Sequence, residues 1–156
     1  MLLLYTVCLF GHRRLENVIA VEDELRKVVA KVIAEHEAVE FLIGREGDFD
    51  LLAASVIKSE IQKSDTGGCS LTLVMPYLRA DFTNNQESYE AYYDSVELCE
   101  PSASAHPKAA IQIRNRAMVD RSDLCIFYIK HPYGGAFRTM RYAEEGEKEI
   151  IGIQYN

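Results

Sequence analysis

The stretch LCIFYIKHPYGGAFRTMRYAEEGE, residues 124–147, joins an apolar run to a segment of helical composition through two adjacent glycines. A continuous apolar run predicts a strand that is buried on both faces, as in a parallel sheet. A plain turn needs only one residue that tolerates a positive φ angle. Gly134 and Gly135 therefore predict more than a turn: they predict that a helix N-terminus, with its partial positive charge, lies against a bound group.

The same alternation of apolar run and helical segment continues along the rest of the chain. Pro107 suits the first turn of its helix, and Asn17 is a candidate N-cap. Only residues 77–105 are irregular, and there we expect a short helix at 86–93 and a short strand at 96–99. Strands are predicted at residues 2–10, 39–44, 67–76, 124–129 and 149–155, and helices at 15–37, 49–65, 106–123 and 135–147.

Strands that alternate with helices predict an α/β fold. We expect a Rossmann-like three-layer sandwich with a mostly parallel central sheet, formed by residues 1–156 as a single domain. Residues 2–10 are apolar at nearly every position, so this segment is predicted to be a central strand with both faces covered.

The bulk composition narrows the classes of function. The net charge of −7 argues against non-specific binding of DNA or RNA, which requires a basic surface, although local arginines can still attract a small anion. The four cysteines form no C-x-x-C pair and are expected to be free thiols, mostly buried, in a reducing cytosol. No apolar run is long enough for a membrane span, so we expect a cytoplasmic protein without a membrane partner. The histidines lack metal-ligand spacing, and neither a metal nor a cofactor is expected.

Ligands of such sheets bind beyond the carboxyl ends of the strands, where helix N-termini converge. Glycines or arginines follow three of the predicted strands, a pattern that favours a bound anion. The candidate binding residues lie at or near the strand ends, except for two in the predicted helix 106–123, Arg114 and Asn115. The others are Gly11, His12, Arg13, Arg14, Gly44, Glu46, Gly47, Asp50, Pro76, Tyr77, Gly134, Gly135, Ala136 and Thr139. No catalytic residue is assigned.

Several of these candidates have an alternative, structural interpretation. Gly11 either approaches a phosphate or simply turns the chain. Arg13 and Arg14 either contact a ligand or are solvated. Glu46 and Asp50 either cap the helix that follows them or contact a ligand, and Asp50 is suited to a ribose hydroxyl.

Two further candidates lie elsewhere on the sheet edge. Tyr77 follows a strand-ending proline, where its ring either stacks on a base or packs against the protein. Thr139 lies within the first turn or so of its helix, where its hydroxyl can reach the same group as Gly134 and Gly135.

Five motifs in this order resemble the SLOG superfamily, and more narrowly its YpsA-like and DprA-like Rossmann members. The motifs are FGHRRL, GREGDFDLLAASVI, LVMPY, RNRAMVDRSDLCIFYI and GGAFRTMRYAEEGEKEIIGI, and the resemblance covers nearly the whole chain except residues 79–105. It implies strand-end loops that hold a nucleotide or a nucleotide-derived ligand.

The Lonely Guy phosphoribohydrolases, which are distant relatives, provide a test of enzymatic activity. Their pattern has an arginine four residues before a methionine, which Arg114 and Met118 match. It continues with P-G-G-x-G-T-x-x-E, whereas this chain has Tyr133 in place of the proline and Tyr142 in place of the glutamate. Since that glutamate is implied to serve hydrolysis, the resemblance argues against this activity.

The expected function is therefore binding of a nucleotide or ADP-ribose-like ligand, as a sensor or a sequestering protein. The alternative is a nucleoside-monophosphate N-glycosidase that uses Glu46 or Asp50. Single-stranded DNA binding in the DprA manner ranks lower because of the net charge and the short chain, so a nucleic-acid partner is considered unlikely. A homo-oligomer, a dimer or tetramer, is expected from the resemblance and from the tyrosine-rich segment 89–93, since tyrosine is enriched at interfaces.

Overall fold

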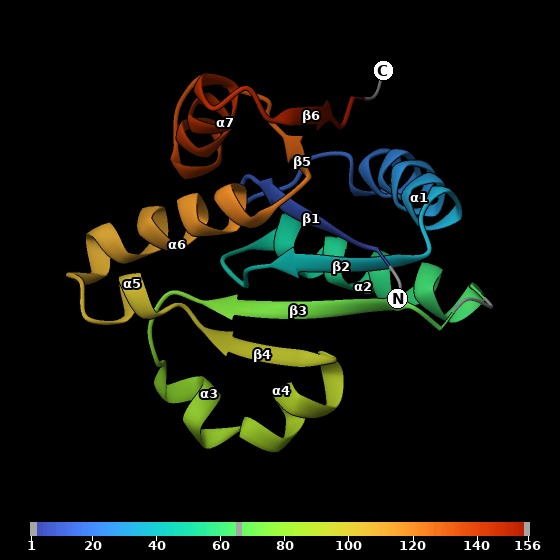
Figure 1. Cartoon of the computed structure of the whole chain (residues 1–156). Coiled ribbons are helices and arrows are strands. Elements are labelled where there is room, and N and C mark those ends of the chain that lie inside the picture. Colours follow the sequence, from blue (N-terminus) through green and yellow to red (C-terminus); the bar gives the residue numbers. More distant parts are fainter. Residues whose placement is uncertain (1–2, 65–66, 155–156) are drawn as a thin grey trace.

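The chain forms one six-stranded sheet in which every pair of neighbouring strands is parallel (Figure 1). The computed structural model describes residues 3–64 and 67–154. The strand order is β4-β3-β2-β1-β5-β6, which confirms the predicted Rossmann-like α/β fold. The strands are β1 (Leu4–Gly11), β2 (Ala38–Ile43), β3 (Cys69–Met75), β4 (Ser95–Leu98), β5 (Leu124–Tyr128) and β6 (Glu149–Gly152).

Strand β1 lies inside the sheet, between β2 and β5, as its apolar run predicts. Its side chains alternate between two core clusters, because successive residues of a strand point to opposite faces. Val7 and Leu9 belong to one cluster, and Cys8 and Phe10 to the other. Both faces of the strand are therefore covered, and the first residue of the predicted segment, residue 2, lies outside the described residues.

Two layers of helices cover the sheet. The helices α1 (Val18–Glu35) and α2 (Asp48–Lys63) contribute buried side chains to the core that includes Val7. The helices α6 (Pro107–Arg121) and α7 (Gly135–Glu145) contribute to the core that includes Cys8. Each of these four helices begins at the carboxyl edge of the sheet, after a strand or a loop. The candidate residues gather at this edge.

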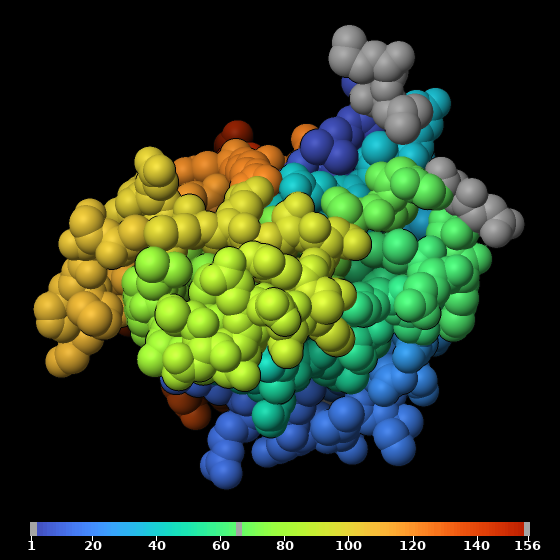
Figure 2. Space-filling view, turned by 90° about the horizontal axis from the view of Figure 1, so that it is seen from below, coloured from blue at the N-terminus to red at the C-terminus, as the bar shows by residue number. Residues whose placement is uncertain are grey.

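The segment between β3 and α6 is more regular than its sequence predicts. The expected short helix and strand are present as α4 (Gln86–Tyr92) and β4, and the additional helices α3 (Ala80–Asn84) and α5 (Glu100–Ala103) accompany them. Long-range contacts hold these two short helices: Phe82 of α3 is buried in the core, and the Ser102 hydroxyl of α5 donates to the Pro76 carbonyl at 2.6 Å. Seen from below, this segment forms the green and yellow front of the molecule (Figure 2).

The structure also tests the predictions for two helix starts, the last strand and the cysteines. Asn17 stands at the N-cap position of α1 with a φ angle of 54°, but its side chain makes no capping hydrogen bond. Pro107 occupies the first turn of α6 as predicted. The last strand ends at Gly152, earlier than expected, and residue 155 lies outside the described residues. The four cysteines are free, and Cys69 is only half-buried.

No helix of the described part of the chain is long and apolar enough to cross a bilayer. Within the same residues, no three His, Cys, Asp or Glu side chains are placed to hold a metal ion.

Candidate functional site

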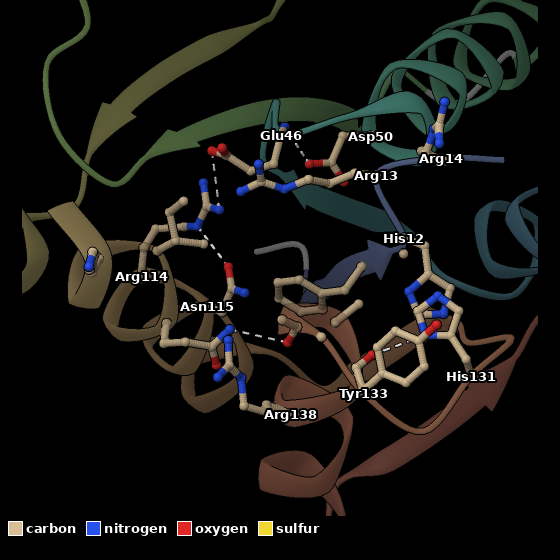
Figure 3. Close-up of a pocket in the computed structure, with 18 of the residues that line it drawn as sticks. His12, Arg13, Arg14, Glu46, Asp50, Arg114, Asn115, His131, Tyr133 and Arg138 are labelled. Atoms are coloured by element: carbon tan, nitrogen blue, oxygen red, sulfur yellow. Dashed lines mark hydrogen bonds and ion pairs between the residues drawn. The ribbon is translucent and has the colours of Figure 1, made fainter.

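A cavity of about 530 Å³ opens at the carboxyl edge of the sheet (Figure 3). Its walls come from the loops after β1, β2 and β5, from the first turns of α2 and α7, and from residues 107–115 of α6. The structure brings together eleven of the predicted site residues here: Gly11, His12, Arg13, Arg14, Glu46, Asp50, Arg114, Asn115, Gly134, Gly135 and Ala136.

The other five predicted residues, which are Gly44, Gly47, Pro76, Tyr77 and Thr139, do not line this cavity. A Cβ atom on Gly44 would lie 2.9 Å from Nη1 of Arg114, and one on Gly47 would lie 2.5 Å from Cα of Arg13. These two glycines therefore make room for protein atoms. Pro76 lines a separate, smaller pocket, and the half-buried Tyr77 ring lies beside the Arg79 guanidinium, 5.3 Å from it.

At three positions of the cavity wall, glycine is also required by the local structure of the protein. A Cβ atom on Gly11 would lie 2.2 Å from Cγ of Phe49, so glycine is needed there for packing. Gly134 has a φ angle of 95°, which favours glycine. A Cβ atom on Gly135 would lie 3.2 Å from Nε2 of Gln112, so this glycine lets α6 and α7 approach each other. The glycine pair thus shapes the start of α7 from within the protein.

Arg114 is the largest fully buried side chain that lines the cavity, with 2% of its surface exposed. Its Nη1 donates to the Val74 carbonyl at 2.8 Å, its Nε donates to Oδ1 of Asn115 at 2.9 Å, and its Nη2 lies 3.5 Å from Oε1 of Glu46. Burial lowers the pKa of this guanidinium, and the nearby carboxylates of Glu46 and Asp50 oppose that shift. Arg114 therefore braces β3, α6 and the loop after β2 against one another.

Asn115 extends this brace to α7. Its Nδ2 donates to Oγ1 of Thr139 at 3.0 Å, and the Thr139 hydroxyl donates to the Gly135 carbonyl at 2.9 Å. Thr139 is fully buried, so its hydroxyl holds the first turn of α7 instead of facing the cavity.

Two carboxylates lie in the cavity wall at the start of α2. Oδ2 of Asp50 accepts a hydrogen bond from the backbone N–H of Glu46 at 2.8 Å. Glu46 also accepts from Arg79, so it joins two arginines. Burial raises the pKa of Asp50 to about 6, although the Glu46 N–H and the Arg114 charge both favour the ionised form.

The rim of the cavity carries four exposed cations: Arg13 and Arg14 from the loop after β1, Lys108 from α6 and Arg138 from α7. None of them forms an ion pair with any described residue. The sequence prediction missed Lys108 and Arg138, although each lies in the first turn of a helix that starts at this edge. A basic residue in the first turn of a helix that starts at this edge is the sequence feature that could have identified them.

A column of three stacked rings forms another wall of the cavity (Figure 3). The rings of His12 and His131 stack with centroids 3.7 Å apart, and those of His131 and Tyr133 with centroids 3.9 Å apart. Burial and the neighbouring His131 lower the pKa of His12, whose Nε2 accepts from the backbone N–H of Lys130 at 2.9 Å. His12 is therefore neutral, with its proton on Nδ1, and serves as the inner support of the column. Tyr133 forms the outer end, 65% exposed.

Tyr142, which occupies the position of the hydrolase glutamate, does not line the cavity. Its hydroxyl donates to Oδ1 of Asp120 on α6 at 2.7 Å, and the Arg116 guanidinium lies over its ring. Its side chain is thus engaged between α6 and α7.

No family model matches the sequence, and no curated protein matches it. Solved structures do share its fold. DNA processing protein A (DprA) from Streptococcus pneumoniae superposes with a TM-score of 0.69 at 14% identity, over 98% of this chain and 51% of that chain. DprA from Helicobacter pylori, whose structure describes a single-stranded DNA binding mode, superposes with a TM-score of 0.67 at 15% identity, over 97% and 66% of the two chains. This chain thus spans between half and two thirds of those structures.

These similarities correct the expected function and partners. The ranking of a nucleotide-derived small molecule above single-stranded DNA is wrong, and so is the expectation that a nucleic-acid partner is unlikely. The net charge sums the whole surface and does not show that four exposed cations lie together at one cavity. The expected homo-oligomer also finds no support: Tyr93 is 2% exposed and Tyr89 is partly buried against the core, so Tyr92 is the one exposed tyrosine of the segment 89–93. By structure, the chain is similar to the Rossmann-like fold of DprA proteins.

Proposed function

We propose that this protein binds single-stranded DNA in the cavity at the carboxyl edge of its sheet. The observation that carries the proposal is the combination of unpaired cations on the rim with a stacked aromatic column beside them. Proteins that bind single strands combine a positively charged groove for the backbone with aromatic rings on which bases stack. The single-stranded DNA binding mode of the Helicobacter pylori DprA structure supports the same assignment by analogy of fold.

The rim cations account for affinity. Arg13, Arg14, Lys108 and Arg138 can each contact a phosphate, because all four are exposed and none forms an ion pair with another described residue. Binding of a single strand then releases counterions, and log K falls with log salt concentration with a slope of about −0.7 per phosphate neutralised. Three to four contacts predict a slope of about −2 to −3.

The aromatic column accounts for preference for single strands over duplex. The outer face of Tyr133 is exposed, whereas its inner face is supported by His131. An unpaired base can stack on this ring, while the bases of a duplex are already stacked on one another. Stacking of one base on a protein ring contributes about 1–3 kcal/mol.

In this proposal, residues 1–156 form one SLOG-like Rossmann domain that binds single-stranded DNA in a DprA-like manner. The hydrogen bonds among the buried side chains of Arg114, Asn115 and Thr139 then position the start of α7, which forms one side of the DNA-binding cavity.

Fluorescence anisotropy with a labelled 20-nucleotide oligothymidylate tests the proposal. We expect salt-dependent binding that a matched duplex competes for poorly, and an Arg13→Ala/Arg138→Ala variant that binds at least tenfold more weakly with a smaller salt slope. Arg141→Ala is the matched control, because Arg141 lies on α7 outside the cavity, beside Glu144. Equal loss in the control and the cavity variant, or no binding by the wild type at low salt, would overturn the assignment.

A further inference from the structure

The charges of the cavity are arranged in two layers. The cations Arg13, Arg14, Lys108 and Arg138 lie on the exposed rim, whereas the carboxylates of Glu46 and Asp50 are recessed in the wall. The recess also contains the buried Arg114 guanidinium, but this cation lies 3.5 Å from Glu46, which accepts from Arg79 as well. The Asp50 carboxylate has no such ion pair with a described residue and disfavours phosphate beside it, so a polyanion that meets this cavity is held with its backbone at the rim. The part of a nucleotide that can enter the recess is the neutral base.

One carboxylate oxygen of Asp50 remains available in this recess as a hydrogen-bond acceptor. The side chain is 8% exposed and lines the cavity, and its Oδ2 accepts from the Glu46 N–H. Its Oδ1 has no hydrogen-bond partner among the described residues. Glu46, in contrast, is engaged by Arg79 and Arg114. Asp50 therefore supplies the carboxylate oxygen that is free to accept from a bound molecule.

We propose that Asp50 is a specificity-determining residue that selects guanine among the bases entering the cavity. The inference rests on the proposed binding of single-stranded DNA. Guanine presents two adjacent donors on its Watson–Crick edge, the N1–H and the N2 amino group. Thymine presents one N–H between two carbonyl oxygens, and adenine and cytosine each present an amino group next to a ring nitrogen that is itself an acceptor.

An ionised carboxylate oxygen is attracted by the two adjacent donors of guanine and repelled by acceptors beside a single donor. Asp50 is only 8% exposed, so water screens its charge weakly, which strengthens both effects. A well-placed polar contact to a base edge discriminates against the wrong base by about 1–3 kcal/mol, so a preference of about tenfold is expected.

The test uses anisotropy with 12-nucleotide oligodeoxyadenylates that carry one central guanine, inosine, cytosine or adenine. Inosine keeps the N1–H of guanine and lacks its N2 amino group. For the wild type, we expect the guanine oligonucleotide to bind about tenfold more tightly than the adenine and cytosine ones, with inosine between them.

The Asp50→Asn variant keeps an oxygen that can accept from the Glu46 N–H and turns an amide NH₂ toward the cavity. It is expected to lose the guanine preference to within about twofold. Asp48→Asn is the matched control, since Asp48 is exposed on the same helical turn and does not line the cavity. It should keep the preference.

The outcomes separate the two proposals. Tight binding of all four oligonucleotides with equal affinity, or a guanine preference that survives Asp50→Asn, overturns the role of Asp50 and leaves single-stranded DNA binding standing. Failure of every oligonucleotide to bind at low salt overturns both.

Discussion

Replacing Asp50 by asparagine is expected to stabilise the protein at neutral pH. Burial raises the pKa of Asp50 from 3.8 to about 6, which means that the native state resists ionisation of this carboxyl group. A shift of about two pKa units corresponds to about 3 kcal/mol. Asparagine removes the buried charge and retains an acceptor for the Glu46 N–H, so the variant should gain up to about this amount.

The sign of the pH dependence follows from proton binding. Between pH 3.8 and about 6, the native state holds the Asp50 proton more tightly than the unfolded state does. The stabilising effect of the protonated group is therefore complete below pH 3.8 and is lost as the pH rises through about 6. The advantage of Asp50→Asn over the wild type should be small at pH 4 and largest above pH 7.

Urea unfolding of the wild type and Asp50→Asn at pH 4, 5, 6, 7 and 8 measures this difference. Asp48→Asn serves as control for the change in net charge, because its carboxylate is exposed. A free energy of unfolding that is no higher for Asp50→Asn than for this control at pH 8 would refute the reasoning. So would a difference between Asp50→Asn and wild type that is the same at pH 4 and pH 8.

Three further substitutions test the packing and the site. Gly11→Ala places a Cβ atom 2.2 Å from the Phe49 ring and should lower the free energy of unfolding by about 1–3 kcal/mol; unchanged urea unfolding would contradict the packing role. Arg114→Met removes the donor to the Val74 carbonyl and one of the two arginine partners of Glu46, and should lower the free energy of unfolding by about 1–3 kcal/mol, whereas a neutral effect would show that the brace is dispensable. Tyr133→Ala should weaken oligothymidylate binding by about 1–3 kcal/mol without changing the melting temperature, because the ring is 65% exposed, and equal affinity would argue against stacking.

Most of the fold was predictable because its signals are local. The continuous apolar run of β1 and the 3.6-residue spacing of apolar side chains in α1 both appear in the sequence as periodicities, and the structure confirms them. The short helices α3 and α5 escaped prediction because they have too few residues for a period. Phe82 and Ser102 stabilise them through contacts with residues distant in sequence, and such contacts leave no local pattern.

The candidate site was predictable in position and only partly in composition. Parallel strands bring their carboxyl ends to one edge, so His12, Arg13 and Asp50 could be placed together from topology alone. The close approach of Gly11 to Phe49 depends on tertiary packing, which a sequence pattern does not carry. The ring column was missed because His131 and Tyr133 stand in what the sequence presents as a turn, and the stacking of His131 on His12 joins residues over a hundred positions apart.

Photocrosslinking with an oligothymidylate that contains 5-iodouracil tests the central claim most directly, because this base crosslinks to aromatic rings on which it stacks. Irradiation of the complex followed by peptide mass spectrometry is expected to place the crosslink on Tyr133, and Tyr133→Ala should abolish it, whereas Tyr92→Ala should not. A crosslink confined to a tyrosine outside the cavity, such as Tyr92 on α4, would contradict binding of single-stranded DNA at this site.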